Sequence, residues 1–283
     1  MTDVGGGGGA AGKGGARRRV GLIALDLDGT LMRKDHTVSE ANASAVHDAV
    51  AAGIHIVLAT SRWYVLAKRT ADLLGIHSPI ICNNGAMVRD PADGARLLDL
   101  RIGADAARDI ASVADELRCE GMVTVDDATY VVTARAGMGS AAAAIGMVIV
   151  ERLAAHASGG AESFLFFGRE TVDAMLARVG PAYGAQLNLA TGYSETFPPY
   201  LNIVHGDADK GRALVLVCEH AGVPIEESMA IGDAAPDLEM LRVAGVSMAM
   251  GNAPDEVKSQ VDVVGPSNED DGVAWAIREF ALG

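Results

Sequence analysis

The hydrophobic residues near the start of this chain form short apolar runs, each followed by polar residues and then by a segment with apolar residues at helical spacing. Short apolar runs that end in turn residues are typical of buried parallel strands, and helical spacing is typical of amphipathic helices. The predicted strands are 20–25, 54–59 and 79–82. The predicted helices are 39–52 and 63–74. This alternation indicates an α/β fold with a doubly wound, Rossmann-like parallel sheet.

The pattern changes after Gly85 and returns near residue 209. In between we predict strands at 96–102, 163–167 and 186–204, a hairpin at 122–133, and helices at 104–117, 140–155 and 170–183. Such a mixture of hairpins and helices indicates an α+β module inserted into the first domain. The alternation then resumes with helices at 209–221, 235–243 and 273–280 and strands at 228–231 and 246–250.

We therefore predict one domain interrupted by another and preceded by an arm. Residues 20–87 and 200–283 would form the α/β core, and 88–199 the inserted module. Residues 1–19 contain the run Gly5–Gly9 and end in three arginines. Glycine at that density loses much backbone entropy on folding and offers little apolar surface, so we expect a disordered arm.

Composition restricts the possible partners. The chain has 23 basic and 37 acidic residues and a formal charge of −14, which argues against nucleic acid as a partner. Its apolar runs are far shorter than the roughly 20 residues that span a bilayer, and the run after the arginines is too short for a signal peptide. We expect a cytoplasmic monomer or homodimer without membrane contact. Cys82, Cys119 and Cys218 form no Cys-x-x-Cys pair, so we expect buried thiols.

Four polar clusters lie where a predicted strand ends or a predicted helix begins. They are Asp26 with Asp28, Thr60 with Ser61, Lys210, and Asp233 with Asp237. Each cluster alone is more often a turn, a helix cap or a surface charge. In an open α/β sheet, however, ligands bind beyond the carboxyl ends of the strands, so neighbouring strands would bring all four to one crevice. These side chains together suit phosphoryl transfer, which needs positioning and neutralisation of charge on the phosphoryl oxygens.

Taken in this order, the clusters resemble the motifs of the haloacid dehalogenase-like (HAD) superfamily. Asp26-Leu27-Asp28-Gly29-Thr30-Leu31 resembles the first motif, Thr60 the second, Lys210-Gly211 the third, and Gly232-Asp233 with Asp237 the fourth. The inserted module resembles the cap domain of class IIB, the Cof-like sugar phosphatases. The residues around Asn84, Asn252 and Asn268 resemble further signatures of that subfamily. The resemblance covers nearly all of the chain from Val20 to Phe280.

The resemblance implies a role for each of these residues. Asp26 would attack phosphorus and form an aspartyl-phosphate, and Asp28 would protonate the leaving alkoxide and later deprotonate the attacking water. Lys210 would neutralise charge in the transition state and hold Asp26 in position. The implied phosphate contacts are Leu27, Thr60, Ser61 and Lys210, and the implied substrate-side residues are Asn84 and Gly85. The implied cofactor is Mg²⁺, bound by Asp26, Asp28 and Asp233, with Asp237 behind it.

One position departs from the pattern of the subfamily. Pro236 stands where the subfamily usually has an asparagine that contacts phosphate, so that amide and a backbone N–H are absent here. The resemblance otherwise implies a Mg²⁺-dependent phosphomonoesterase acting on a small phosphorylated metabolite, a sugar phosphate above all. Two alternatives stay open. One is a phosphomutase similar to phosphomannomutase, and the other is a non-catalytic protein that binds a phosphorylated ligand.

Overall fold

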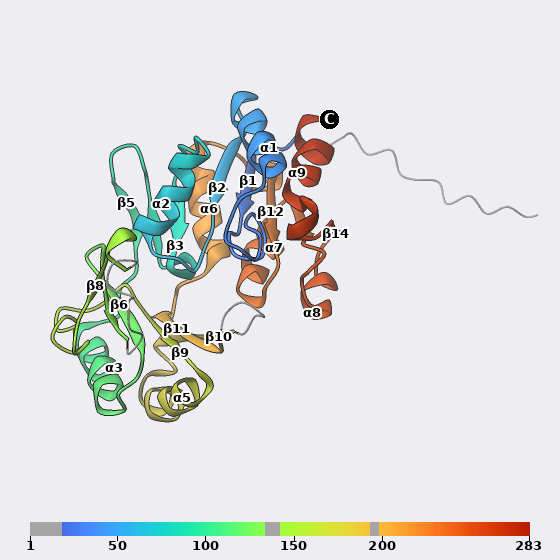
Figure 1. Ribbon diagram of the computed structural model, residues 1–283. Coiled ribbons are helices and arrows are strands. Elements are labelled where there is room, and N and C mark those ends of the chain that lie inside the picture. The colour runs from blue at the N-terminus through green and yellow to red at the C-terminus, as the bar shows by residue number, and fades with distance from the viewer. Residues whose placement is uncertain (1–18, 134–141, 193–197) are drawn as a thin grey trace, which may run out of the picture.

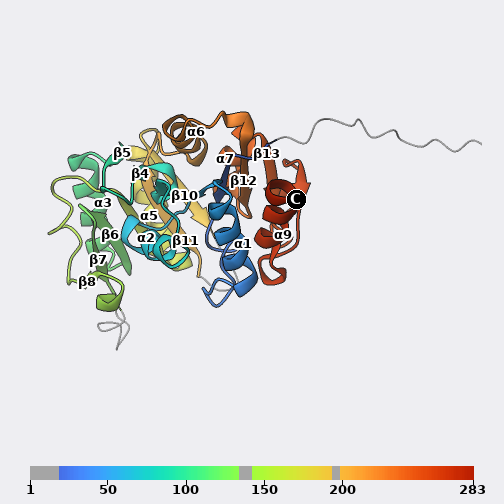
Figure 2. The same cartoon turned by 90° about the horizontal axis from the view of Figure 1, so that it is seen from above.

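The computed structural model describes residues 19–133, 142–192 and 198–283. Residues 1–18 of the expected arm lie outside this described part. The chain forms a parallel sheet between two layers of helices and, beside it, a second sheet with helices on one face (Figures 1 and 2). No helix within the described ranges is long and apolar enough to cross a membrane. Cys82, Cys119 and Cys218 are free and buried, as predicted from the sequence.

The core sheet contains five parallel strands in the order β14-β13-β12-β1-β2. Their bounds are Leu22–Leu25 for β1, His55–Leu58 for β2, Ser228–Gly232 for β12, Val246–Ala249 for β13 and Val263–Val264 for β14. Strand β1, which lies between β12 and β2, is buried along its whole length, as expected for a strand covered on both faces. The doubly wound α/β class predicted from the sequence is confirmed. Strand β14 was not predicted, because a strand of 2 residues gives too short a pattern.

Helices cover both faces of this sheet. One layer contains α1 (Glu40–Ala51), α2 (Tyr64–Leu73) and α9 (Gly272–Ile277), and the other contains α6 (Lys210–Ala221), α7 (Leu238–Val243) and α8 (Asp255–Lys258). Ile23 and Leu25 of β1 are buried with residues of the first layer. Leu22 and Ala24 point the other way and are buried with residues of the second. The alternation of side chains along β1 therefore supplies both halves of the core.

A three-stranded antiparallel sheet, in the order β3-β4-β5, extends the core beyond β2. Its strands are Ile80–Cys82, Met87–Arg89 and Arg96–Asp99. A parallel bridge between Ala59 and Ile81 joins it to the end of β2. The short helical turns are η1 Asn83–Gly85, η2 Ile225–Glu227, η3 Ala235–Asp237, η4 Asn268–Asp270 and η5 Arg278–Leu282.

The second large sheet has six strands in the order β10-β11-β9-β6-β7-β8. Their bounds are Gly121–Val125 for β6, Ala128–Val132 for β7, Met147–Ile149 for β8, Ser163–Phe167 for β9, Leu187–Gly192 for β10 and Tyr200–His205 for β11. Neighbouring strands pair antiparallel, except β7 with β8. Helices α3 (Ala104–Glu116) and α5 (Arg169–Tyr183) cover one face, where Phe164 and Phe166 are fully buried.

The helix predicted over 140–155 is wrong in its described part. Only residues 142–144 are helical, and β8 follows at Met147–Ile149, where it pairs with β7. Gly146 has a φ of 79°, which ends the helical course, and β-branched residues follow it. Residues 140 and 141 lie outside the described part of the chain.

The predicted domain boundaries also differ from the observed strand pairing. Strand β11, expected in the core from residue 200, pairs with β9 and β10 in the second sheet. The hairpin of β4 and β5, expected mostly in the module from residue 88, pairs with β3 beside the core. A hydrophobic pattern indicates that a strand exists and not which strand it joins. We therefore propose that the inserted module comprises residues 100–205.

Candidate active site

The carboxyl ends of the core strands carry the acidic residues singled out in the sequence. Asp26 follows β1 and Asp233 follows β12, and these two strands pair in parallel with Leu25 beside Ile231. The backbone N–H of Asp26 donates to the carbonyl of Ile231 at 3.0 Å. The two carboxylates therefore leave neighbouring strands at one edge of the sheet, and this edge faces β10 and β11 of the module (Figure 1).

A buried lysine links two of the carboxylates. Lys210 is the first residue of α6, and its ammonium donates to Asp26 Oδ1 at 2.7 Å and to Asp237 Oδ1 at 2.6 Å. The other oxygen of Asp237 accepts the backbone N–H groups of Asp233 and Ala234 at 3.1 and 3.0 Å. Asp237 is therefore held through both oxygens, and Lys210 holds one oxygen of Asp26.

The turn after β1 depends on Gly29. Its φ of 88° lies in the region that favours glycine, and a Cβ atom there would lie 2.4 Å from Asp233 Oδ2. Thr30 donates its hydroxyl to Asp233 Oδ1 at 2.8 Å. The side-chain amide of Asn252 donates to the Gly29 carbonyl, also at 2.8 Å. Because Gly29 has no side chain, the turn can lie directly against the Asp233 carboxylate.

Three carboxylates cluster around the Lys210 ammonium. Asp26, Asp233 and Asp237 each place an oxygen within 4.8 Å of the others. Burial raises the pKa of Asp26, and the charge of Asp237 raises it further, while Lys210 opposes both effects. Burial and the charge of Asp237 also raise the pKa of Asp233, to about 7. Oxygen donors with an excess of negative charge fit a hard divalent cation such as Mg²⁺.

The ammonium of Lys210 stays charged in this setting. Burial alone would lower the pKa of Lys210, but the charges of Asp237 and Asp26 outweigh it and raise that pKa above its ordinary value. A permanently charged ammonium in contact with Asp26 can neutralise charge that develops on a ligand bound there.

A pocket of about 60 Å³ opens beside this cluster. Its lining residues are Asp26, Asp28, Ser61, Asn84, Ala190, Tyr200, Lys210, Ala234, Pro236 and Asp237. Residues from all four polar clusters and from the Asn83-Asn84-Gly85 turn therefore meet at one pocket. Leu27, Thr60 and Gly85 are buried and lie outside its lining. Tyr200, Ala190 and Ala234 were not singled out in the sequence.

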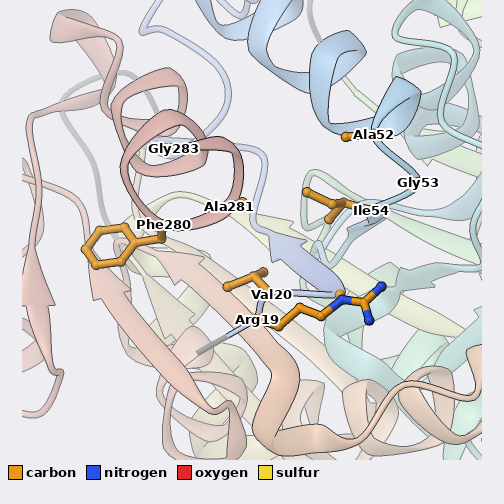
Figure 3. Close-up of a pocket in the computed structure, with 9 residues that line it drawn as sticks. Arg19, Val20, Ala52, Gly53, Ile54, Phe280, Ala281 and Gly283 are labelled. Atoms are coloured by element: carbon orange, nitrogen blue, oxygen red, sulfur yellow. The ribbon is translucent and has the colours of Figure 1, made fainter. Parts of the chain in front are cut away.

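A larger cavity, of about 290 Å³, lies at the opposite edge of the core sheet, beside the starts of β1 and β2 and the end of the chain (Figure 3). The apolar side chains of Val20, Ile54 and Phe280 line it, and Arg19 is the one charged side chain among its described lining residues. It contains none of the clustered carboxylates. Cavity size alone therefore does not identify the candidate site.

Arg62 is a polar residue of the site that sequence reasoning missed. Its guanidinium donates through Nε to Asp28 Oδ2 at 2.7 Å and through Nη2 to Asp28 Oδ1. A two-point pair of this kind fixes the orientation of the carboxylate. Its backbone N–H also donates to Thr60 Oγ1 at 3.1 Å. The sequence signal that could have identified it was its position directly after Thr60 and Ser61, between β2 and α2.

The turn after β3 joins the core to the module. Asn83 and Asn84 have φ angles of 49° and 53°, a left-handed conformation that asparagine tolerates better than most residues. The side-chain amide of Asn84 donates to Asn202 Oδ1 of β11 at 3.1 Å. Ser163 of β9 donates its hydroxyl to Asn83 Oδ1 at 3.2 Å. Asn84 therefore contacts the module and also lines the pocket.

Known proteins are similar to most of this chain. It is 28% identical over 291 residues to phosphatase YwpJ of Bacillus subtilis, with 92% of this chain and 99% of that protein covered. It is 29% identical over 280 residues to the chloroplastic endoribonuclease YBEY of Arabidopsis thaliana, with 92% of this chain and 46% of that protein covered. The chain therefore spans less than half the length of the Arabidopsis protein.

Solved structures share the fold. A haloacid dehalogenase-like hydrolase from Bacteroides thetaiotaomicron has a TM-score of 0.81 at 23% identity, covering 92% of this chain and 99% of that one. A HAD subclass IIB sugar phosphatase has a TM-score of 0.75 at 20% identity, covering 92% and 98%. The family model described as haloacid dehalogenase-like hydrolase matches residues 23–277. The chain therefore belongs to the haloacid dehalogenase-like hydrolases.

Proposed function

We propose that this chain is a Mg²⁺-dependent phosphomonoesterase that hydrolyses a small phosphorylated metabolite, a sugar phosphate, through an aspartyl-phosphate on Asp26. The observation that carries this proposal is the buried Asp26 carboxylate, which Lys210 holds at 2.7 Å in a pocket also lined by Asp28 and Ser61. The phosphatase name of the Bacillus subtilis relative and the fold shared with a sugar phosphatase support it.

In the first step, Oδ2 of Asp26 forms a bond to phosphorus while the bond from phosphorus to the leaving oxygen breaks. Lys210 holds Oδ1 in place and offsets charge on the phosphoryl oxygens. Asp28 gives its proton to the leaving oxygen, which departs as an alcohol. Because Arg62 pairs with Asp28 in the structure, this proton transfer requires that pair to open.

In the second step, a water molecule attacks the phosphorus of the aspartyl-phosphate. Asp28, now ionised, accepts the proton of this water as its oxygen bonds to phosphorus. The bond between phosphorus and Asp26 breaks, and inorganic phosphate leaves. Both carboxyl groups return to their starting protonation states, so the reaction consumes one water for each ester.

We assign the metal to the acidic cluster of Asp26, Asp233 and Asp237. Asp26 and Asp233 would hold it with carboxylate oxygens and Asp28 with its backbone carbonyl. Asp237 would stay behind it, because both of its oxygens are already engaged by Lys210 and backbone N–H groups. A bound Mg²⁺ supplies positive charge, which reduces the repulsion between a carboxylate and an anionic phosphate.

We assign the phosphate contacts to the loops after β1 and β2 and to the start of α6. The proposed residues are Leu27, Thr60, Ser61 and Lys210. Pro236 lines the same pocket and makes that part of its wall apolar. The phosphate would therefore be held mainly from the side of Ser61 and Lys210.

Release of inorganic phosphate from a panel of sugar phosphates, with and without Mg²⁺, tests the proposed function. We expect turnover that EDTA abolishes and added Mg²⁺ restores. Isomerisation of a sugar phosphate without phosphate release would indicate a phosphomutase instead. Binding of phosphorylated ligands without any turnover would indicate a binding protein. Either result would contradict the proposal.

Mg²⁺ should stabilise the protein more at high pH than at low pH. The pKa of Asp233 is about 7 in the metal-free folded chain, against about 4 in an unfolded chain. Because the folded pKa is the higher one, ionisation of Asp233 costs stability as the pH rises from about 4 to about 7. Mg²⁺ favours the ionised form and offsets that cost. We expect Mg²⁺ to raise the melting temperature by several degrees more at about pH 8 than at about pH 5.

The variant Asp233→Asn is the control for this effect. It removes the titrating charge but keeps an oxygen that can accept the Thr30 hydroxyl. Without Mg²⁺ at about pH 8 it should melt above the wild type, and Mg²⁺ should shift its melting temperature little. Equal Mg²⁺ shifts of the wild type at both pH values would contradict the role given to Asp233.

A further inference from the structure

The inserted module contributes two residues to the described lining of the pocket, Ala190 of β10 and Tyr200 of β11. Strand register explains why these two lie there. Side chains two apart in a strand share a face, so Tyr200 lies on the same face as Asn202, which contacts Asn84 of the core. Leu201 points the other way and is buried in the core of the module. Tyr200 is therefore the one side chain of the module with a polar group in this described lining.

Gly192 fixes the position of the Tyr200 ring. The two residues are directly paired across β10 and β11. A Cβ atom on Gly192 would lie 2.2 Å from the Tyr200 Oη and 2.3 Å from its Cζ. The hydroxyl end of the ring therefore lies across the bare backbone of Gly192, in space that any other residue would fill. Gly192 is not among the described lining residues, but its lack of a side chain allows the phenol of Tyr200 to lie where it does.

The Tyr200 phenol remains neutral beside the charged cluster. Burial raises the pKa of Tyr200, and the charge of Asp26 raises it further, against a smaller opposing effect of Lys210. At neutral pH the hydroxyl can therefore both donate and accept a hydrogen bond. A group with these two capacities can exchange a hydrogen bond with a hydroxyl of a ligand.

Asn84 lines the same pocket, and its amide is held in a fixed orientation. Its side-chain N–H₂ donates to Asn202 Oδ1, which sets the orientation of the amide. Its Oδ1 is buried and has no hydrogen-bond partner among the residues that the structure describes. A buried carbonyl oxygen without a hydrogen bond raises the free energy of the unliganded protein. A ligand whose O–H group donates to this oxygen supplies the missing hydrogen bond, which favours binding of that ligand. A carboxylate of a ligand can only accept, and it would meet this oxygen unfavourably.

We propose that Tyr200, placed by Gly192, is the specificity-determining residue of the module and, with Asn84, binds a hydroxyl of the leaving group. This inference rests on the proposed function and refines it. The leaving-group hydroxyl would donate to Asn84 Oδ1 and exchange a hydrogen bond with the Tyr200 phenol. The two module residues in the described lining of the pocket, Ala190 and Tyr200, carry no positive charge. The substrate class is therefore a neutral, hydroxylated phosphate ester, as opposed to an ester whose leaving group carries a carboxylate.

Two esters matched in size separate this role from a structural one. We would compare glycerol 3-phosphate with propyl phosphate, which lacks the two free hydroxyls. In Tyr200→Phe, the ratio of kcat/KM for the hydroxylated ester over the other should fall about tenfold, mostly through KM. Gly192→Ala should lower the same ratio, because its methyl group displaces the phenol. Tyr183→Phe changes a partly buried tyrosine of α5 whose hydroxyl donates to Asp109, so it is the matched control and should leave the ratio unchanged.

The double variant gives the sharpest test. Tyr200→Phe and Gly192→Ala would disturb one hydrogen bond, so their combined effect on the ratio should be clearly smaller than the product of the single effects. An unchanged ratio in Tyr200→Phe, or multiplicative effects in the double variant, would overturn the inference while phosphatase activity itself persists. Absence of phosphate release from every ester by the wild type would overturn the proposed function, and this inference with it.

Discussion

Replacing Asp26 with asparagine is expected to lower kcat for phosphate release by at least about 10⁴-fold. The amide has nearly the same size, but its nitrogen and oxygen do not form a stable bond to phosphorus. The fold should persist, because the oxygen of the substituted amide can still accept the hydrogen bond that Lys210 now donates to Oδ1 at 2.7 Å. Steady-state phosphate release and thermal melting, measured on the same preparation, check both parts of this expectation.

An exposed aspartate provides the matched control for this substitution. Asp72→Asn makes the same chemical change on α2, where the carboxylate pairs with Lys68 near the surface. It should leave kcat within about twofold of the wild type. Substantial turnover in Asp26→Asn would show that the nucleophile is another group, even if the protein is a phosphatase. A large loss of melting temperature would instead show that Asp26 is needed for the fold.

One property of parallel sheets made it possible to predict from the sequence that the acidic residues lie close together. Asp26 and Asp233 each follow an apolar strand, and strands β1 and β12 turn out to be direct neighbours. Parallel neighbours place their carboxyl ends at the same edge, so two residues more than 200 positions apart in the chain meet there. Lys210 lies beside them because it is the first residue of α6, the helix that packs on this sheet.

The contribution of the module could not be anticipated in the same way. Tyr200 reaches the pocket because β11 pairs with β10 in a register that sets it against Gly192. Pairing partners depend on contacts across the whole sheet, and the hydrophobic pattern of a single strand does not specify them. The sequence therefore placed Tyr200 in the core domain, at its boundary of residue 200. Arg62 was missed for a different reason, since an isolated arginine gives no periodic signal.

The last prediction concerns the buried lysine. Lys210→Met should destabilise the protein by about 3–5 kcal/mol, because it leaves the carboxylates of Asp26 and Asp237 without their common partner. It should also lower kcat by about 10²–10³-fold, through the loss of positive charge at the phosphoryl group. Chemical denaturation in EDTA measures the first effect and phosphate release in Mg²⁺ the second. Lys68→Met, which breaks the exposed pair with Asp72, should change neither by more than a small amount.

A second substitution shows whether the unpaired charges cause this loss of stability. In Asp237→Asn the amide oxygen can still accept a hydrogen bond, but one buried negative charge is gone. Adding it to Lys210→Met should recover part of the lost free energy of unfolding, because fewer charges are then left unpaired. It should not recover kcat, because the ammonium that acts on the phosphoryl group is still absent. If the double variant were instead less stable than Lys210→Met by the full cost of Asp237→Asn alone, then lost packing of the lysine chain, and not its charge, would explain the instability.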